Sequence, residues 1–129
     1  MDVLPSSNYT QWYKDYLKTN LEITGKNNKI FLIGDNTVKC LENINNVTFI
    51  DINKYIHHPT ILNYKKFFVN YSSNGYGIEW LCFSRIFILN LFLKEFNIDS
   101  IFHLDSDNIL LKNIITFSIF IFKEEQNNI

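Results

Sequence analysis

The chain has 129 residues, of which 47% are hydrophobic and 16% aromatic, which fits one folded domain over residues 1–129 and excludes a disordered chain. Twelve Lys and Arg residues against 13 Asp and Glu residues give a net charge of −1. No basic field is therefore expected that would attract nucleic acid or an anionic membrane surface.

The cysteines and the apolar segments favour a cytoplasmic protein without a membrane span. Cys40 and Cys82 lack metal-ligand spacing and are too few for a disulfide framework, so we expect reduced, buried thiols. The N-terminus lacks the charged and apolar regions of a secretory signal, which favours a cytoplasmic location. The apolar residues 78–93 include the charged residues Glu79 and Arg85, which favours a buried helix over a transmembrane segment.

A first helix is predicted from about residue 9, after candidate N-cap residues at Ser6, Ser7 and Asn8. Apolar side chains recur at helical spacing along one stripe, which we expect to be the buried face. The stripe consists of Tyr9, Trp12, Tyr13, Tyr16, Leu17 and Leu21. Gly25 and the polar residues after it predict the exit turn.

Three strands follow in the predicted order, at residues 29–35, 47–52 and 101–104, and no strand is predicted after residue 104. Residues 38–44 predict a short helical piece, and residues 78–96 predict a long helix. A loop through the two histidines before Pro59 separates the second strand from this helix. Alternation of strands and helices predicts an α/β fold with a mainly parallel sheet flanked by helices.

The segment FHLDSDNILL, residues 102–111, ends a buried strand on two carboxylates, Asp105 and Asp107. In an extended segment residues i and i+2 point the same way, so we expect both carboxylates to converge on one ligand while Ser106 points elsewhere. Parallel sheets bind ligands outside the carboxyl ends of their strands. Hard oxygen ligands suit Mg²⁺ or Mn²⁺, ions that take substrate phosphate as a further ligand.

An arginine lies on the predicted apolar face of the long helix. That face consists of Leu81, Arg85, Leu89, Phe92 and Phe96. A buried guanidinium keeps its proton and needs an anionic partner. Two interpretations stay open: an internal ion pair of Arg85 with Asp105 or Asp107, or a site where the arginine and a cation hold the same diphosphate.

Other polar residues carry weaker signals. His103 is interpreted as a sheet histidine rather than a metal ligand, and His57 and His58 as facing solvent. Asp35 and Asp51 fit turn or capping roles as well as ligand binding. A polar loop suited to hydrogen bonding with a ligand contains Tyr71, Ser72, Ser73 and Asn74.

Three segments, KIFLIGDN, NYSSNGYGIEW and CFSRIFILNLFLKEFNIDSIFHLDSDNILL, together resemble glycosyltransferases of the GT-A fold over most of residues 8–114. The resemblance implies a Rossmann-like half that binds a nucleotide-sugar donor, with Mn²⁺ or Mg²⁺ on the donor diphosphate. It implies Asp107 as the main metal ligand, with Asp105 contacting the metal or the ribose. Arg85, Asp105 and Ser106 are the substrate-binding residues that the resemblance implies.

The implied activity is metal-dependent transfer of a sugar from a nucleotide-diphosphate-sugar donor to an unknown glycan, lipid or protein acceptor. Only 22 residues follow Asp107, so we expect the donor-binding half without the family's acceptor half, and no catalytic base is assigned. The alternative is a catalytically inactive α/β module that acts through association with another chain. A phosphatase-type domain with Asp105 as nucleophile lacks the Thr or Gly-rich turn expected after the motif.

Overall fold

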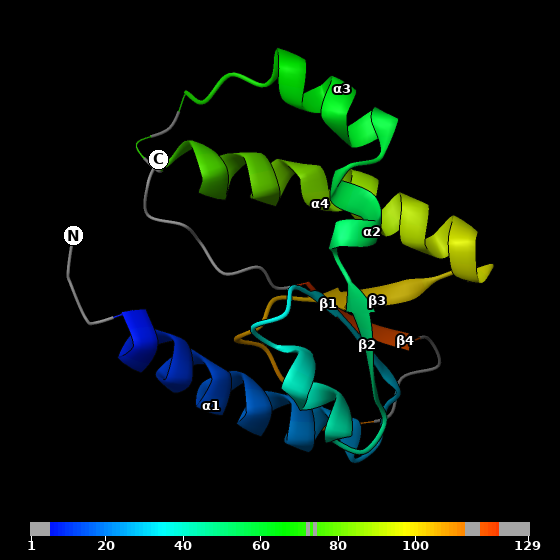
Figure 1. The fold of residues 1–129 in the computed structure, drawn as a ribbon. Helices are drawn as coiled ribbons and strands as arrows, with labels where there is room; N and C mark the ends of the chain where they lie inside the picture. Colours follow the sequence, from blue (N-terminus) through cyan, green and yellow to red (C-terminus); the bar gives the residue numbers. More distant parts are fainter. Residues whose placement is uncertain (1–5, 72, 74, 113–116, 122–129) are drawn as a thin grey trace. The chain divides into compact units, whose positions relative to one another are not determined.

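The computed structural model describes residues 6–71, 73, 75–112 and 117–121 (Figure 1). Its elements are α1 (Ser6–Gly25), β1 (Ile30–Gly34), η1 (Lys39–Asn43), β2 (Val47–Asp51), α2 (Asn53–Ile56), α3 (Pro59–Phe67), α4 (Tyr76–Phe96), β3 (Ile101–Leu104) and β4 (Phe117–Ile121). The chain divides into two compact units. Of the described residues, the first unit comprises 6–51, 100–112 and 117–121, and the second comprises 52–71, 73 and 75–99.

The first unit is built on a four-stranded sheet in the order β2-β1-β4-β3, in which every pair of neighbours is parallel. Leu32 of β1 and Leu104 of β3 are both aligned with Phe120 of β4, which lies between them. The predicted α/β class with a parallel sheet is confirmed. Because the strands are parallel, the carboxyl ends of β1, β2 and β3 lie at one edge of the sheet.

The strand β4 was not predicted. Residues 117–121, FSIFI, contain two phenylalanines and two isoleucines, a composition that favours strands. Without tertiary context a run this short is ambiguous, since periodicity alone does not separate a buried strand from other apolar segments. Its two parallel neighbours, β1 and β3, define its position in the sheet.

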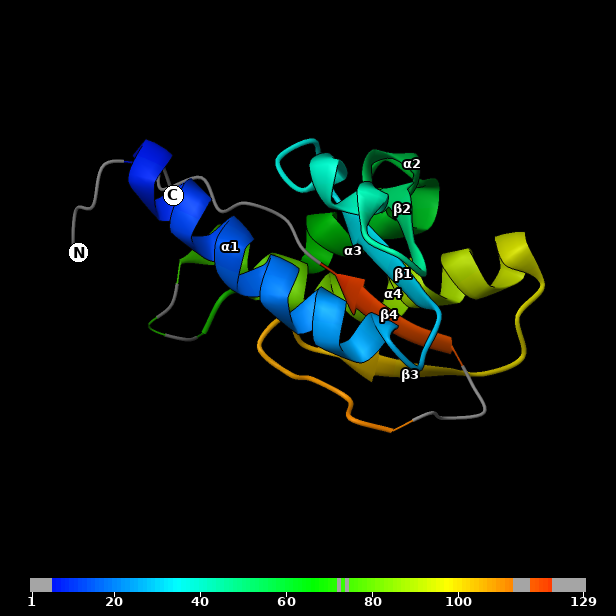
Figure 2. The same ribbon diagram turned by 90° about the horizontal axis from the view of Figure 1, so that it is seen from below.

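Helix α1 packs on the sheet of the first unit through its C-terminal half. Leu17 and Leu21 are fully buried and share a hydrophobic core with Leu32 and Leu104. In Figure 2 this half of α1 lies alongside the strands and the N-terminal half extends past them. The prediction that the whole apolar stripe of α1 is buried is therefore wrong, because Trp12 and Tyr16 in its N-terminal half are 60% and 42% exposed.

The second unit consists of α2, α3 and α4. Helix α3 begins at Pro59, a favoured first helical position, and the Nδ1 atom of His58 accepts the Thr60 N–H at 3.2 Å. A loop was predicted through the two histidines before Pro59, and the helices on either side of them, α2 ending at Ile56 and α3 beginning at Pro59, were not predicted. His57 and His58 are exposed, as expected.

Helix α4 buries a stripe with a spacing of four residues. The stripe consists of Trp80, Ser84, Ile88 and Phe92. Apolar residues also lie on the other faces of the helix, and Ile86 is 73% exposed. Hydropathy alone therefore does not define the buried face. Of the predicted stripe through Arg85 only Phe92 is buried, and Leu81, Arg85 and Leu89 each lie one residue after a buried position. Among the described residues, no helix has both the length and the apolar character needed to cross a membrane.

Both cysteine thiols are free and exposed, so the expectation of buried thiols is wrong. Cys40 lies on η1 directly before Leu41, whose side chain enters the core of the first unit. Cys82 lies on α4 between Trp80 and Ser84, and is turned away from the buried stripe by the helical winding.

Candidate functional site

The carboxylates Asp105 and Asp107 lie in a tight turn that follows β3, which we call the acidic turn (residues 105–108). The Asn108 N–H donates to the Asp105 carbonyl oxygen at 3.0 Å, and the Asp105 N–H donates to the Asn108 Oδ1 atom at 3.3 Å. The predicted extended geometry is therefore wrong, since the chain turns here. Both aspartate side chains are exposed at the carboxyl edge of the sheet.

Ser106, at the centre of the acidic turn, is held by helix α1. The Nδ2 atom of Asn20 donates to the Ser106 carbonyl oxygen at 2.8 Å. The Ser106 hydroxyl forms a hydrogen bond with the Tyr13 hydroxyl. Ser106 is partly buried and contacts α1, and its predicted role in substrate binding stays a prediction.

The segment after the acidic turn is also fixed to α1, and Figure 2 shows it in orange beside this helix. The buried Thr24 hydroxyl oxygen accepts the Leu110 N–H at 3.0 Å. The Nδ2 atom of Asn28 donates to the Lys112 carbonyl oxygen at 3.0 Å and to the Thr24 carbonyl oxygen at 3.2 Å. These bonds supply partners to backbone groups that belong to no strand, which lets an irregular segment pack against a helix.

Sequence reasoning missed this polar seam, defined by Asn20, Thr24 and Asn28, although a signal for it was present. The three residues recur every four positions, beside the apolar Leu17 and Leu21. Residues at this spacing lie on one face of a helix and its continuation. Amide and hydroxyl side chains that recur every four residues beside a buried apolar stripe indicate that this helix packs against an irregular backbone segment as well as a sheet.

Other acids lie at the carboxyl edge of the same sheet. Asp51 is the last residue of β2 and pairs with Gly34 of β1. The Oδ1 atom of Asp35 accepts two hydrogen bonds from Thr37, from its N–H at 3.0 Å and from its hydroxyl at 2.5 Å. These bonds stabilise the turn after β1, so the capping role weighed for Asp35 has direct support. His103, on the edge strand β3, is exposed.

Arg85 belongs to the second unit and is partly exposed on α4. Its Nε atom donates to the carbonyl oxygen of Cys82, one turn earlier, at 3.4 Å. The expectation of a fully buried guanidinium is therefore wrong. Asp105 and Asp107 belong to the first unit, so the role of Arg85 beside them stays a prediction. In the polar loop, Tyr71 is 93% exposed, and Ser72 and Asn74 lie outside the described residues.

The acidic turn suits one kind of metal site and not another. Within the described part of the chain, no group of three or more His, Cys, Asp or Glu side chains could enclose a metal ion. Mg²⁺ does not need such a group, because it is commonly bound by one or two carboxylates, several waters and substrate phosphates. The two exposed aspartates fit an open site of that type, which a phosphate ligand would complete.

No protein-family model matches the chain, and neither a curated protein nor a solved structure is significantly similar to it.

Proposed function

We propose that the chain is a metal-dependent glycosyltransferase of the GT-A type, with a Rossmann-like half that binds a nucleotide-diphosphate-sugar donor at the acidic turn. One observation carries the proposal. Ser106 fixes the acidic turn to α1 through its backbone and hydroxyl, while Asp105 and Asp107 on either side are exposed at the carboxyl edge of a parallel sheet. This edge is where open α/β sheets bind their ligands.

The roles proposed within the acidic turn combine the resemblance to GT-A glycosyltransferases with the hydrogen bonds that hold the turn on α1. Asp107 and Asp105 would hold a divalent cation against the donor diphosphate, as acceptors of a hard ion. When bound, the cation would neutralise charge on the departing nucleoside diphosphate. Asn20 and Tyr13 keep the turn in position by binding Ser106. Arg85 is proposed as a further contact of the diphosphate or the transferred sugar.

The acceptor is proposed to be a glycan, a lipid or a protein. No catalytic base is proposed, because no described side chain is placed against a reacting atom. We therefore propose binding of the donor and the metal ion as the primary property of the chain, and sugar transfer as the reaction that this binding would serve.

Thermal unfolding tests donor binding directly. We expect Mn²⁺ together with one of the uridine, guanosine, cytidine or adenosine diphosphates to raise the melting temperature of the whole chain by several degrees. A ligand at 100 times its Kd stabilises the folded state by about 2.7 kcal/mol. The shift should vanish in Asp107→Asn, which keeps the shape of the side chain and removes its charge.

Asp99→Asn is the matched control, because Asp99 is an exposed aspartate outside the acidic turn. It should keep the full shift. No shift with any of the four nucleotides, or the same shift in both variants, would refute the proposal and favour the catalytically inactive module.

A further inference from the structure

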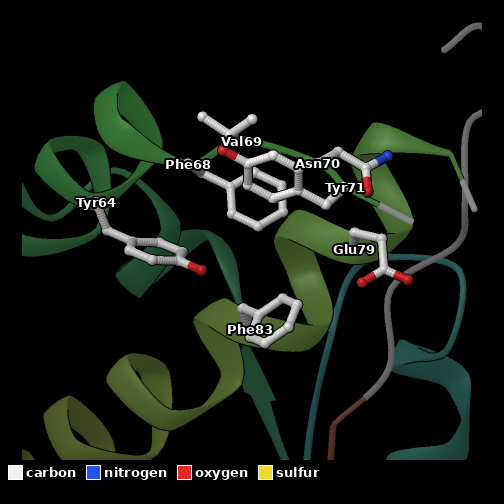
Figure 3. A pocket seen from close by; sticks show the side chains of 7 residues that line it. All are labelled: Tyr64, Phe68, Val69, Asn70, Tyr71, Glu79 and Phe83. Atoms are coloured by element: carbon white, nitrogen blue, oxygen red, sulfur yellow. The ribbon is translucent and has the colours of Figure 1, made fainter.

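The second unit contains a pocket of about 440 Å³ that the proposed donor site does not use. It lies between α3, the segment after α3, and the first turns of α4 (Figure 3). A volume of this size lies in the range of small-molecule sites, about 300–1,000 Å³. We call it the aromatic pocket, and four rings line it: Tyr64, Phe68, Tyr71 and Phe83.

Three of the four rings of the aromatic pocket, those of Tyr64, Phe68 and Phe83, are linked by ring contacts. The ring centroids of Tyr64 and Phe68 lie 5.8 Å apart at an interplanar angle of 48°, and those of Phe68 and Phe83 lie 5.9 Å apart at 46°. Tyr71 is 93% exposed and Phe83 56% exposed. Such large apolar groups at the surface are a feature of ligand and partner sites.

Two polar side chains complete the aromatic pocket. Glu79 and Phe83 are four residues apart on α4, so they lie on the same side of the helix one turn apart. Asn70 belongs to the segment after α3. In Figure 3 the Glu79 carboxylate and the Tyr64 ring lie on opposite sides of the hollow, with Phe83 below them in this view. The pocket therefore presents an apolar wall and a hydrogen-bonding rim to the same ligand.

This combination selects among ligand classes. A hydrocarbon chain would cover the wall, but it offers no hydrogen bond to the Glu79 carboxylate or the Asn70 amide at the rim. A quaternary ammonium group requires ring faces arranged around it, each within about 6 Å. Here Phe68 contacts both Tyr64 and Phe83, so these three rings form a wall on one side of the ligand rather than a cage around a cation. A pyranose matches, since one face carries C–H groups and its edge carries hydroxyls.

We propose that the aromatic pocket binds a saccharide, with the sugar's C–H face on Tyr71 and Phe83 and its hydroxyls bonded to Glu79 and Asn70. The site lies within the second unit and needs neither the acidic turn nor a metal ion. The inference therefore stands apart from the proposed donor binding, and either can fail without the other.

Saturation-transfer NMR on the whole chain tests the inference in the presence of EDTA, which removes metal-dependent donor binding. The probes are the methyl glycosides of glucose, galactose, mannose and N-acetylglucosamine, with choline and uridine as comparison compounds. We expect transfer to at least one glycoside, strongest at the protons of one sugar face. Tyr71→Ala and Phe83→Ala should each weaken this binding about three- to tenfold, the effect expected of one aromatic contact.

Phe67→Ala is the matched control, because Phe67 is an aromatic residue of the same unit that is 76% exposed and does not line the aromatic pocket. It should leave glycoside binding unchanged. Tyr71 is 93% exposed, so Tyr71→Ala should leave the melting temperature unchanged. Weaker glycoside binding by this variant would therefore come from the lost ring contact and not from unfolding. Absence of transfer to all four glycosides, preference for choline or uridine, or equal binding by Tyr71→Ala and Phe67→Ala would overturn the inference.

Discussion

Asn20 is the residue on which the position of the acidic turn depends most. Its amide is buried on α1, with only 8% of the residue exposed, and it donates to the carbonyl oxygen of Ser106 at 2.8 Å. The two residues are 86 positions apart in the sequence, so this bond joins the start of the first unit to its last third. A partly buried carbonyl that loses its donor keeps the cost of its desolvation.

We therefore expect Asn20→Ala to lower the free energy of unfolding by about 1–3 kcal/mol, measured by urea denaturation. The matched control is Thr19→Ala, because the exposed Thr19 hydroxyl bonds only within the helix, to the Asp15 carbonyl oxygen. That variant should change the free energy of unfolding by less than about 0.5 kcal/mol. Equal effects of the two substitutions would contradict the anchoring role of Asn20.

At the scale of elements, a cluster of polar side chains ties α2 to α4 within the second unit. Lys54 Nζ lies 2.5 Å from Glu95 Oε1, and the Tyr55 hydroxyl donates to Glu95 Oε2 at 2.7 Å. The hydrogen bonds from Lys54 and Tyr55 lower the pKa of Glu95. Burial, followed by the hydrogen bond and the charge of Glu95, raises the pKa of Tyr55. One carboxylate thus joins two helices 40 residues apart.

These shifts give a pH dependence with a defined sign. Because the pKa of Glu95 is lower in the folded state, its contribution to stability is present above the unfolded value of about 4.3 and is lost as the pH falls through the folded value. Glu95→Gln should reduce the free energy of unfolding by about 1 kcal/mol at neutral pH and by less in acid.

Urea denaturation between neutral pH and strong acid measures this difference, with Glu42→Gln on η1 as the exposed control. The two unfolding curves of wild type and Glu95→Gln should converge as the pH falls. A gap that stays constant with pH would contradict an ionised Glu95 as the link between the helices.

At the scale of the whole molecule, the strands and helices with continuous apolar runs could be predicted from the sequence. Short elements, and turns whose geometry depends on tertiary contacts, could not. β1, β2 and α4 follow from local pattern, because long or fully apolar segments permit few alternatives. Helix α3 was missed although Pro59 at its first position is a start signal, because the two histidines before it suggested a loop. The end of β3 before Asp105 was predicted, but the turn after it was not, because that turn depends on Asn108 and on contacts with α1.

The sheet of the first unit makes a prediction about β4. Because β4 pairs with β1 and β3 on its two sides, its amides should be among the slowest to exchange with deuterium, close to the global free energy of unfolding. Amides of β2 and β3, at the outer positions of the described sheet, should exchange faster. Hydrogen exchange followed by NMR measures both. Rapid exchange throughout residues 117–121 would contradict the central position of β4.

The central claim is that the acidic turn holds a divalent cation together with a nucleoside diphosphate, and paramagnetic broadening by Mn²⁺ tests it most directly. With the nucleotide that gives the largest thermal shift, Mn²⁺ should broaden the amide signals of residues 105–108 and of the α1 residues that bind the turn, Tyr13 and Asn20. Mg²⁺ should leave these signals sharp, and Asp107→Asn should abolish the broadening. Broadening centred elsewhere, or undiminished in Asp107→Asn, would contradict the account.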